Sequence, residues 1–130
     1  MTKEGYVEYW ISNSKKDWKR AENCFRDKDY VFCLFCIHLS LEKICKALWV
    51  KNSKENVPPR IHNLERLLME AKIKLAESDM VFMRDMNTFQ IEGRYPDYLG
   101  KIYKTYNKKF TAEIFEKAKS MRKWLTGMLQ

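Results

Sequence analysis

The sequence contains little glycine and proline, and this scarcity disfavours or excludes several classes of protein. Only four Gly and three Pro occur in 130 residues. A β-sandwich or β-barrel needs a turn about every 8–12 residues, so folds with many turns are disfavoured. Neither a GxGxxG sequence nor a Walker A sequence is present, which excludes the familiar glycine-rich loops that bind phosphates.

The chain also lacks a long hydrophobic run. Its most apolar stretch, residues 30–41, has 12 residues and contains His38 and Ser40, whereas a membrane span needs about 20 apolar residues. The first ten residues have no apolar core of the kind found in secretory signals. We therefore expect a cytoplasmic protein with no membrane association, whose four cysteines are reduced.

Few side chains suited to metal or acid–base chemistry are present. Cys33 and Cys36 form a CxxC, but inside a predicted helix they are two small apolar residues on one face, and no second ligand pair stands at zinc spacing. We expect neither a metal nor a cofactor. Of the two histidines, His38 lies among apolar residues and is predicted to be a core histidine bonded to a neighbour. His62 either caps the third helix, bonds loop carbonyls or faces a ligand.

Positive charge is in excess and is unevenly placed. The chain has 25 basic and 17 acidic residues, a formal net charge of +8. From Lys101 onward there are eight basic and two acidic residues, a net of +6. This C-terminal region is either a solvated basic helix face or a surface that attracts phosphate, nucleic acid or an acidic protein.

Hydrophobic periodicity predicts helices throughout. The fold expected is a single all-α domain over residues 1–130, an up-and-down bundle of four to five helices. The second helix is apolar nearly all round, which places it in the buried centre of the bundle. The expected helices cover 3–26, 30–51, 64–75, a fourth capped by Ser78 or Asp79 and reaching Phe89, and a last one capped by Thr111 and reaching Leu129.

Three charged residues interrupt the apolar second helix and are candidates for a ligand site. Glu42 and Lys46 form an i, i+4 pair of the favourable orientation, with Lys43 beside them. A charge on a central helix must find a partner or reach water. The group therefore either pairs within the bundle or lies near a cleft or a second subunit.

A short segment after the predicted fourth helix concentrates polar and aromatic side chains. Arg94 offers a planar set of donors suited to phosphate or carboxylate. Tyr95 and Tyr98 offer rings on which bases can stack, and Asp97 lies between them. The alternative is that Arg94 bonds carbonyls at the end of the fourth helix while Tyr95 packs.

Several short motifs together resemble the HEPN domain family. They are Trp10 with Ala-Glu at 21–22, Asp-Tyr at 29–30, Ser-Leu-Glu-Lys at 40–43 with Lys-Ala-Leu at 46–48, Pro-Pro-x-x-His-Asn-Leu at 58–64, and Arg-Tyr-Pro-Asp at 94–97.

The resemblance implies a helical bundle that pairs as a homodimer. Many members act beside a minimal nucleotidyltransferase, as toxin–antitoxin or two-component pairs, and others are metal-independent ribonucleases. The ribonucleases carry a His four to six residues after an Arg, but the six residues after Arg94 contain no His. The resemblance therefore favours a subunit that binds nucleotide or RNA without catalysis. A ribonuclease toxin and a purely structural docking subunit are the alternatives.

Overall fold

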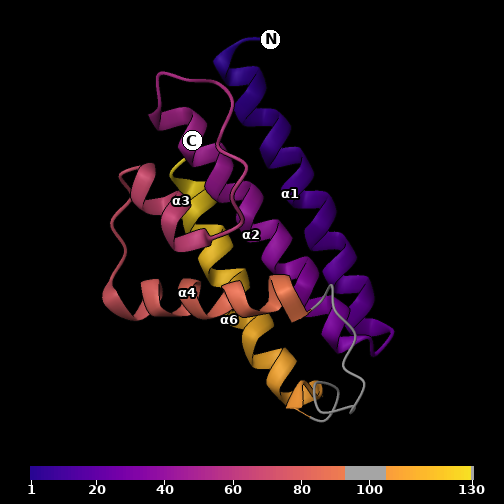
Figure 1. Cartoon of the computed structure of the whole chain (residues 1–130). Coiled ribbons are helices and arrows are strands. Elements are labelled where there is room, and N and C mark those ends of the chain that lie inside the picture. Colours follow the sequence, from indigo (N-terminus) through magenta and orange to yellow (C-terminus); the bar gives the residue numbers. More distant parts are fainter. Residues whose placement is uncertain (93–104, 130) are drawn as a thin grey trace.

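Five α-helices form the described part of the chain, which comprises residues 1–92 and 105–129 of a computed structural model (Figure 1). No strand occurs within these residues, so the all-α prediction is confirmed. As far as the described residues extend, none of the helices is long and apolar enough to cross a bilayer. The helices are α1 (Lys3–Arg26), α2 (Tyr30–Asn52), α3 (Leu64–Glu70), α4 (Glu77–Glu92) and α6 (Lys108–Gly127).

The first two helices form a tight hairpin and lie side by side (Figure 1). Thr2 caps α1 by accepting a hydrogen bond from the amide of Gly5. Asp29 caps α2 by accepting from the amide of Phe32. Between them Lys28 adopts φ 63°, a left-handed conformation that reverses the chain in three residues. The predicted bounds of these two helices are confirmed to within one residue.

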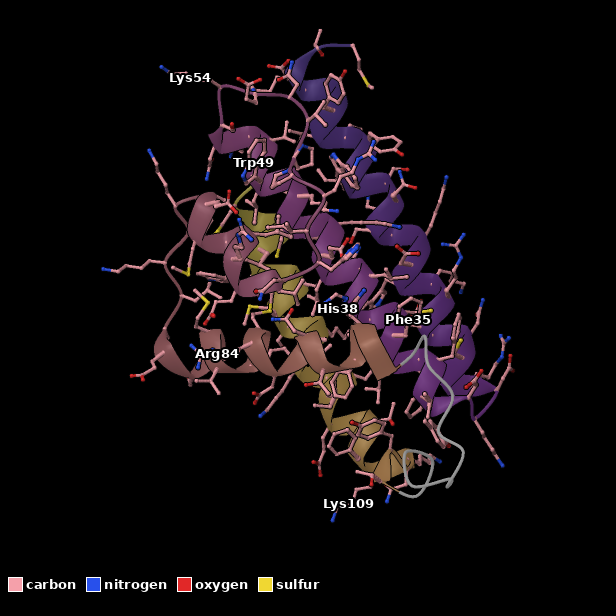
Figure 2. All side chains as sticks on the ribbon, in the orientation of Figure 1. Phe35, His38, Trp49, Lys54, Arg84 and Lys109 are labelled. Carbon is pink, nitrogen blue, oxygen red and sulfur yellow. The ribbon has the colours of Figure 1, made fainter. Side chains whose placement is uncertain are left out.

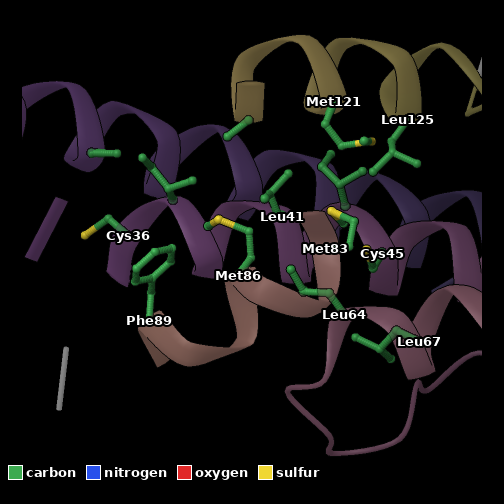
Figure 3. Packing of buried hydrophobic residues seen from close by; sticks show 14 of the residues in the cluster. Cys36, Leu41, Cys45, Leu64, Leu67, Met83, Met86, Phe89, Met121 and Leu125 are labelled. Carbon is green, nitrogen blue, oxygen red and sulfur yellow. The ribbon is translucent and has the colours of Figure 1, made fainter. Parts of the chain in front are cut away.

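Helix α2 occupies the centre of the bundle and packs against each of the other four helices (Figure 1). Most of its residues are buried, on all sides of the helix. Figure 3 shows apolar side chains of α3, α4 and α6 meeting those of α2 in one continuous core. The predicted buried central helix is therefore confirmed, and burial of its surface is the main stabilising contribution to the fold.

Two helix boundaries differ from those expected between residues 70 and 79. Helix α3 ends at Glu70, because Lys72 takes φ 60° and turns the chain out of the helical path. Leu75 still packs against the core, but from a loop. Helix α4 begins at Glu77, so the prediction that Ser78 or Asp79 caps it was wrong: both lie within its first turn.

The start of the last helix also differs. Asn107 caps α6 by accepting a hydrogen bond from the amide of Phe110. Thr111, the predicted cap, lies inside the helix and is fully buried. Both residues are good caps by type, and the bundle selects Asn107 because Thr111 is needed on the inward face.

The cysteines of α2 pack as small apolar residues. Cys33, Cys36 and Cys45 are buried, and none of the four cysteines forms a disulfide. Burial raises the pKa of Cys33 and of Cys36 to about 12, so both thiols are protonated near neutral pH. This agrees with the interpretation of the CxxC as part of the core.

Candidate functional site

A buried carboxylate on α2 is the centre of the first polar cluster. Glu42 is only 4% exposed. Its Oε2 accepts a hydrogen bond from Lys46 Nζ at 3.1 Å, and its Oε1 lies 3.0 Å from His62 Nδ1. His38 Nδ1 is 3.9 Å from the same Oε1. Two turns of α2 and the loop before α3 therefore bring three basic groups to one carboxylate.

The edge of this cluster reaches the surface through His62. Lys46 is nearly buried and lies 5.3 Å from the centre of the Trp10 ring, where the ring face stabilises its charge. The His62 side chain is 46% exposed. Because Nδ1 donates to Glu42, Nε2 of the neutral ring is left as a proton acceptor. A carboxylate that orients an imidazole in this way is a general acid–base arrangement.

His38 lies at the centre of the molecule and is fully buried (Figure 2). Burial lowers the pKa of His38 to about 4, an effect that the Glu42 carboxylate opposes only in part. The ring is therefore neutral near pH 7. The prediction of a core histidine is confirmed. Neither ring nitrogen has a well-formed hydrogen bond within the described residues, and the Asn87 side chain and the His62 backbone act on the ring only weakly, against the effect of burial.

A second carboxylate joins α1 to α2 on the neighbouring turn. Asp17 is 1% exposed and accepts from Lys43 Nζ through Oδ2. Its Oδ1 accepts from Arg20 Nη1 at 2.6 Å. Each buried carboxylate thus has two basic partners at hydrogen-bond distance, and neither leaves a negative charge exposed for a ligand.

The predicted site residues fall into two groups. Glu42, Lys46 and His62 are brought together, while Lys43 turns to Asp17 on α1, so of the two alternatives for the α2 charges the structure shows pairing within the bundle. His62 does not cap α3, because that role belongs to Asn63. The remaining predicted site residues lie outside the described part of the chain; they are Arg94, Tyr95, Asp97 and Tyr98.

Sequence reasoning missed the role of Asp17. Asp17 lies on the same, otherwise apolar, face of α1 as Trp10 and Ala21. An acidic residue on such a face is a signal for a buried ion pair. Its partner Lys43 is 26 residues away on α2, and no spacing rule relates two helices at that distance.

Helix α6 carries a basic face without carboxylate partners. The ion pairs of the described residues all involve residues of α1–α4 and the adjoining loops. The first two basic residues of α6 are exposed, and Figure 2 shows Lys109 projecting from the start of the helix. The basic face comprises Lys108, Lys109, Lys119, Arg122 and Lys123, whereas Lys117 lies on the side toward α4, with its ammonium 6.0 Å from the centre of the Phe82 ring.

The fold and these clusters define an all-α bundle with internally neutralised carboxylates and a basic outer helix. The HEPN domain model matches residues 7–128, and the chain therefore belongs to the HEPN domain family. The protein TT1696 of Thermus thermophilus has a similar crystal structure, with a TM-score of 0.79 and 17% identity over 93% of this chain and 96% of that one. The structure of ST0689, described as an archaeal HEPN homologue, aligns with a TM-score of 0.73 and 23% identity over 95% of this chain and 98% of that one. None of the curated proteins matches the chain.

Proposed function

We propose that this HEPN protein is a subunit that binds a phosphate-bearing ligand, either a nucleotide or RNA, without cleaving it. The observation that carries the proposal is the basic face of α6. In the described residues its five cations have no carboxylate partner, whereas the buried carboxylates of Asp17 and Glu42 each have two basic partners. Exposed cations without counter-ions attract phosphate and release condensed counter-ions when it binds.

Membership of the HEPN family supports a proposal for the assembly in which this binding occurs. We propose that the chain acts as a homodimer in the cytoplasm, beside a minimal nucleotidyltransferase that is its partner. A ligand held on α6 would then be presented to the partner enzyme. If neither nucleotide nor RNA binds at low salt, the chain is instead a docking subunit for that partner.

Binding is expected to be steeply salt-dependent. A fluorescent 12-nucleotide RNA and a labelled ATP analogue are titrated with the protein, and anisotropy is recorded from 50 to 200 mM salt. With about four phosphates neutralised on a single strand, the affinity for RNA should fall about 50-fold over this range. No binding of either ligand at the lowest salt would contradict the proposal.

A matched pair of variants tests whether α6 is the binding face. Lys108→Gln with Lys109→Gln removes two charges from the start of α6 and should weaken RNA binding and reduce its salt dependence. Lys54→Gln with Lys74→Gln removes two exposed charges from the α2–α3 and α3–α4 loops and should change neither. Figure 2 shows Lys54 and Lys109 at opposite ends of the molecule.

The Glu42–His62 pair favours a second candidate, a metal-independent ribonuclease. The oriented imidazole could take the proton of a ribose 2′-hydroxyl through Nε2. RNA is incubated with the protein in excess EDTA, and His62→Gln is expected to slow cleavage by about 100- to 10,000-fold. Arg84→Gln, at an exposed ion pair with Glu65, should cleave at the wild-type rate. If the wild-type protein does not cleave RNA, this candidate is discarded and the binding proposal is unaffected.

A further inference from the structure

Two buried serines, Ser14 and Ser40, join α1 to α2. Ser14 Oγ donates to the carbonyl oxygen of Ser40 at 2.8 Å, and Ser40 Oγ donates to the carbonyl oxygen of Ser14 at 2.9 Å. The two Oγ atoms are 3.0 Å apart. Since each hydroxyl proton is committed to a carbonyl, the lone pairs of both oxygens remain available as acceptors.

Arg122 of α6 donates hydrogen bonds to those lone pairs. Its Nε donates to Ser40 Oγ at 2.9 Å and to Ser14 Oγ at 3.3 Å. Its guanidinium carbon lies 5.3 Å from the centre of the Trp18 ring, so the planar group is also held by the indole. The Nε atom and one face of the guanidinium are thus fixed by the fold, and its orientation is set before any ligand arrives.

The charge of Arg122 has no counter-ion among the described residues. The arginines at 20, 26, 66 and 84 each lie within ion-pair distance of a carboxylate, but Arg122 does not. Its two terminal nitrogens, which carry four N–H groups, make no hydrogen bond within that part of the chain. Burial lowers the pKa of Arg122, and the field of Glu22 opposes this, so the group remains charged near neutral pH but is poorly solvated.

The guanidinium lies at a surface hollow of about 540 Å³ between α1 and α6. The hollow contains three basic residues and no acidic one, and the space beside Gly127 is open. Trp18 is already covered by the guanidinium and by Phe115, whose ring centre is 4.7 Å from that of Trp18. The indole therefore positions Arg122 and is not free to stack on a base. The lining residues are Trp18, Lys119, Arg122, Lys123, Thr126 and Gly127.

We propose that this hollow binds a phosphate group, held by the two terminal nitrogens of Arg122 and by the ammonium groups of Lys119 and Lys123. The planar pair of N–H donors matches two phosphate oxygens, which is the strong bidentate arrangement. The two lysines are one helical turn apart and exposed, so they can close on the anion from the same side. The inference rests on the proposed function and assigns it a specific phosphate subsite.

The test uses pyrophosphate as the probe, because it carries the phosphate chemistry without a base. In a ¹H–¹⁵N spectrum the Nε–H signal of Arg122 is identified as the signal that Arg122→Lys lacks. Pyrophosphate should shift this signal saturably in the wild-type protein. Arg122→Gln should weaken pyrophosphate binding at least tenfold, measured by calorimetry.

A second variant separates ligand binding from a structural role of Arg122. Lys119→Gln with Lys123→Gln leaves the hydrogen bonds of Arg122 to the serines intact, and it should weaken pyrophosphate binding about fivefold with an unchanged thermal midpoint. A linear, unsaturable response, or equal affinity in this variant and the wild type, would overturn the subsite.

Titrations with two further ligands distinguish the source of the phosphate. AMP offers a terminal phosphate, and a short RNA without terminal phosphates offers only phosphodiesters. Saturable, Arg122-dependent binding of either one supports the subsite and names its ligand. If pyrophosphate binds through Arg122 while ATP and RNA do not bind, the proposed function fails and the subsite stands. If RNA binds equally to wild type and to Arg122→Gln, and neither pyrophosphate nor AMP binds through Arg122, the subsite fails and the proposed function stands.

Discussion

Replacing Glu42 with alanine is expected to lower the free energy of unfolding by about 3–5 kcal/mol. The substitution leaves the ammonium group of Lys46 nearly buried without its carboxylate, and it also removes the hydrogen-bond partner of His62. Burial of a charge carries a desolvation cost, which the attraction of an opposite charge offsets only while that partner is present. Urea unfolding followed by circular dichroism measures the loss.

A pair with the same spacing on the surface provides the control. Arg66 and Glu70 are also four residues apart, but their side chains are 65% and 40% exposed. Water replaces a lost partner there, so Glu70→Ala should cost less than about 0.5 kcal/mol. Similar losses for Glu42→Ala and Glu70→Ala would show that Glu42 is not the centre of a buried cluster.

A double variant tests whether the cost comes from the unpaired charge. Glu42→Leu combined with Lys46→Met replaces both charges with apolar side chains of similar size. This variant should recover most of the stability that Glu42→Ala loses, because no charge is left buried. A loss as large as that of Glu42→Ala would mean that the packing around Glu42, and not the charge of Lys46, dominates.

Stability is expected to fall by about 2 kcal/mol when the pH is lowered from 7.5 to 5, through His38. The pKa of His38 is about 4 in the folded chain against 6.5 for the free side chain. Between these values the unfolded chain binds more protons, so stability rises with pH in this range. Above about pH 6.5 the His38 ring is neutral in both states and does not lower the free energy of unfolding. As the pH falls toward 4, protonation of the ring in the unfolded chain lowers that free energy progressively. Denaturant unfolding at several pH values measures it.

The variants His38→Leu and His62→Gln assign the pH dependence to one ring. His38→Leu removes the buried group that must take up a proton and should flatten stability between pH 5 and 7.5. His62→Gln removes the half-exposed ring beside the same Glu42 carboxylate and should leave the contribution of His38 in place. An unchanged dependence in His38→Leu would contradict the assignment. The range stops at pH 5 because ordinary carboxylates titrate mainly below it.

Local chemistry was enough to predict α1 and α2. Thr2 and Asp29 are good caps by type, and the apolar positions between them recur with the helical period. The boundaries of α3 and α6 were less predictable. The apolar pattern of α3 continues to Leu75 even though the helix stops at Glu70, and both Asn107 and Thr111 are suitable caps for α6. Where two boundaries were equally suitable by local sequence, tertiary packing decided which one the helix adopts.

The sequence by itself determined the class of fold, the buried central helix, the pairing of Glu42 with Lys46 and the excess of positive charge near the C-terminus. These follow from composition and from neighbours within one helix, which a period of 3.6 residues places together. Only the tertiary structure decided that His62 meets Glu42, that Asp17 meets Lys43, and that Arg122 meets serines 108 and 82 residues away. Periodicity states which face of a helix a residue occupies, but the partner on another helix depends on how the helices pack.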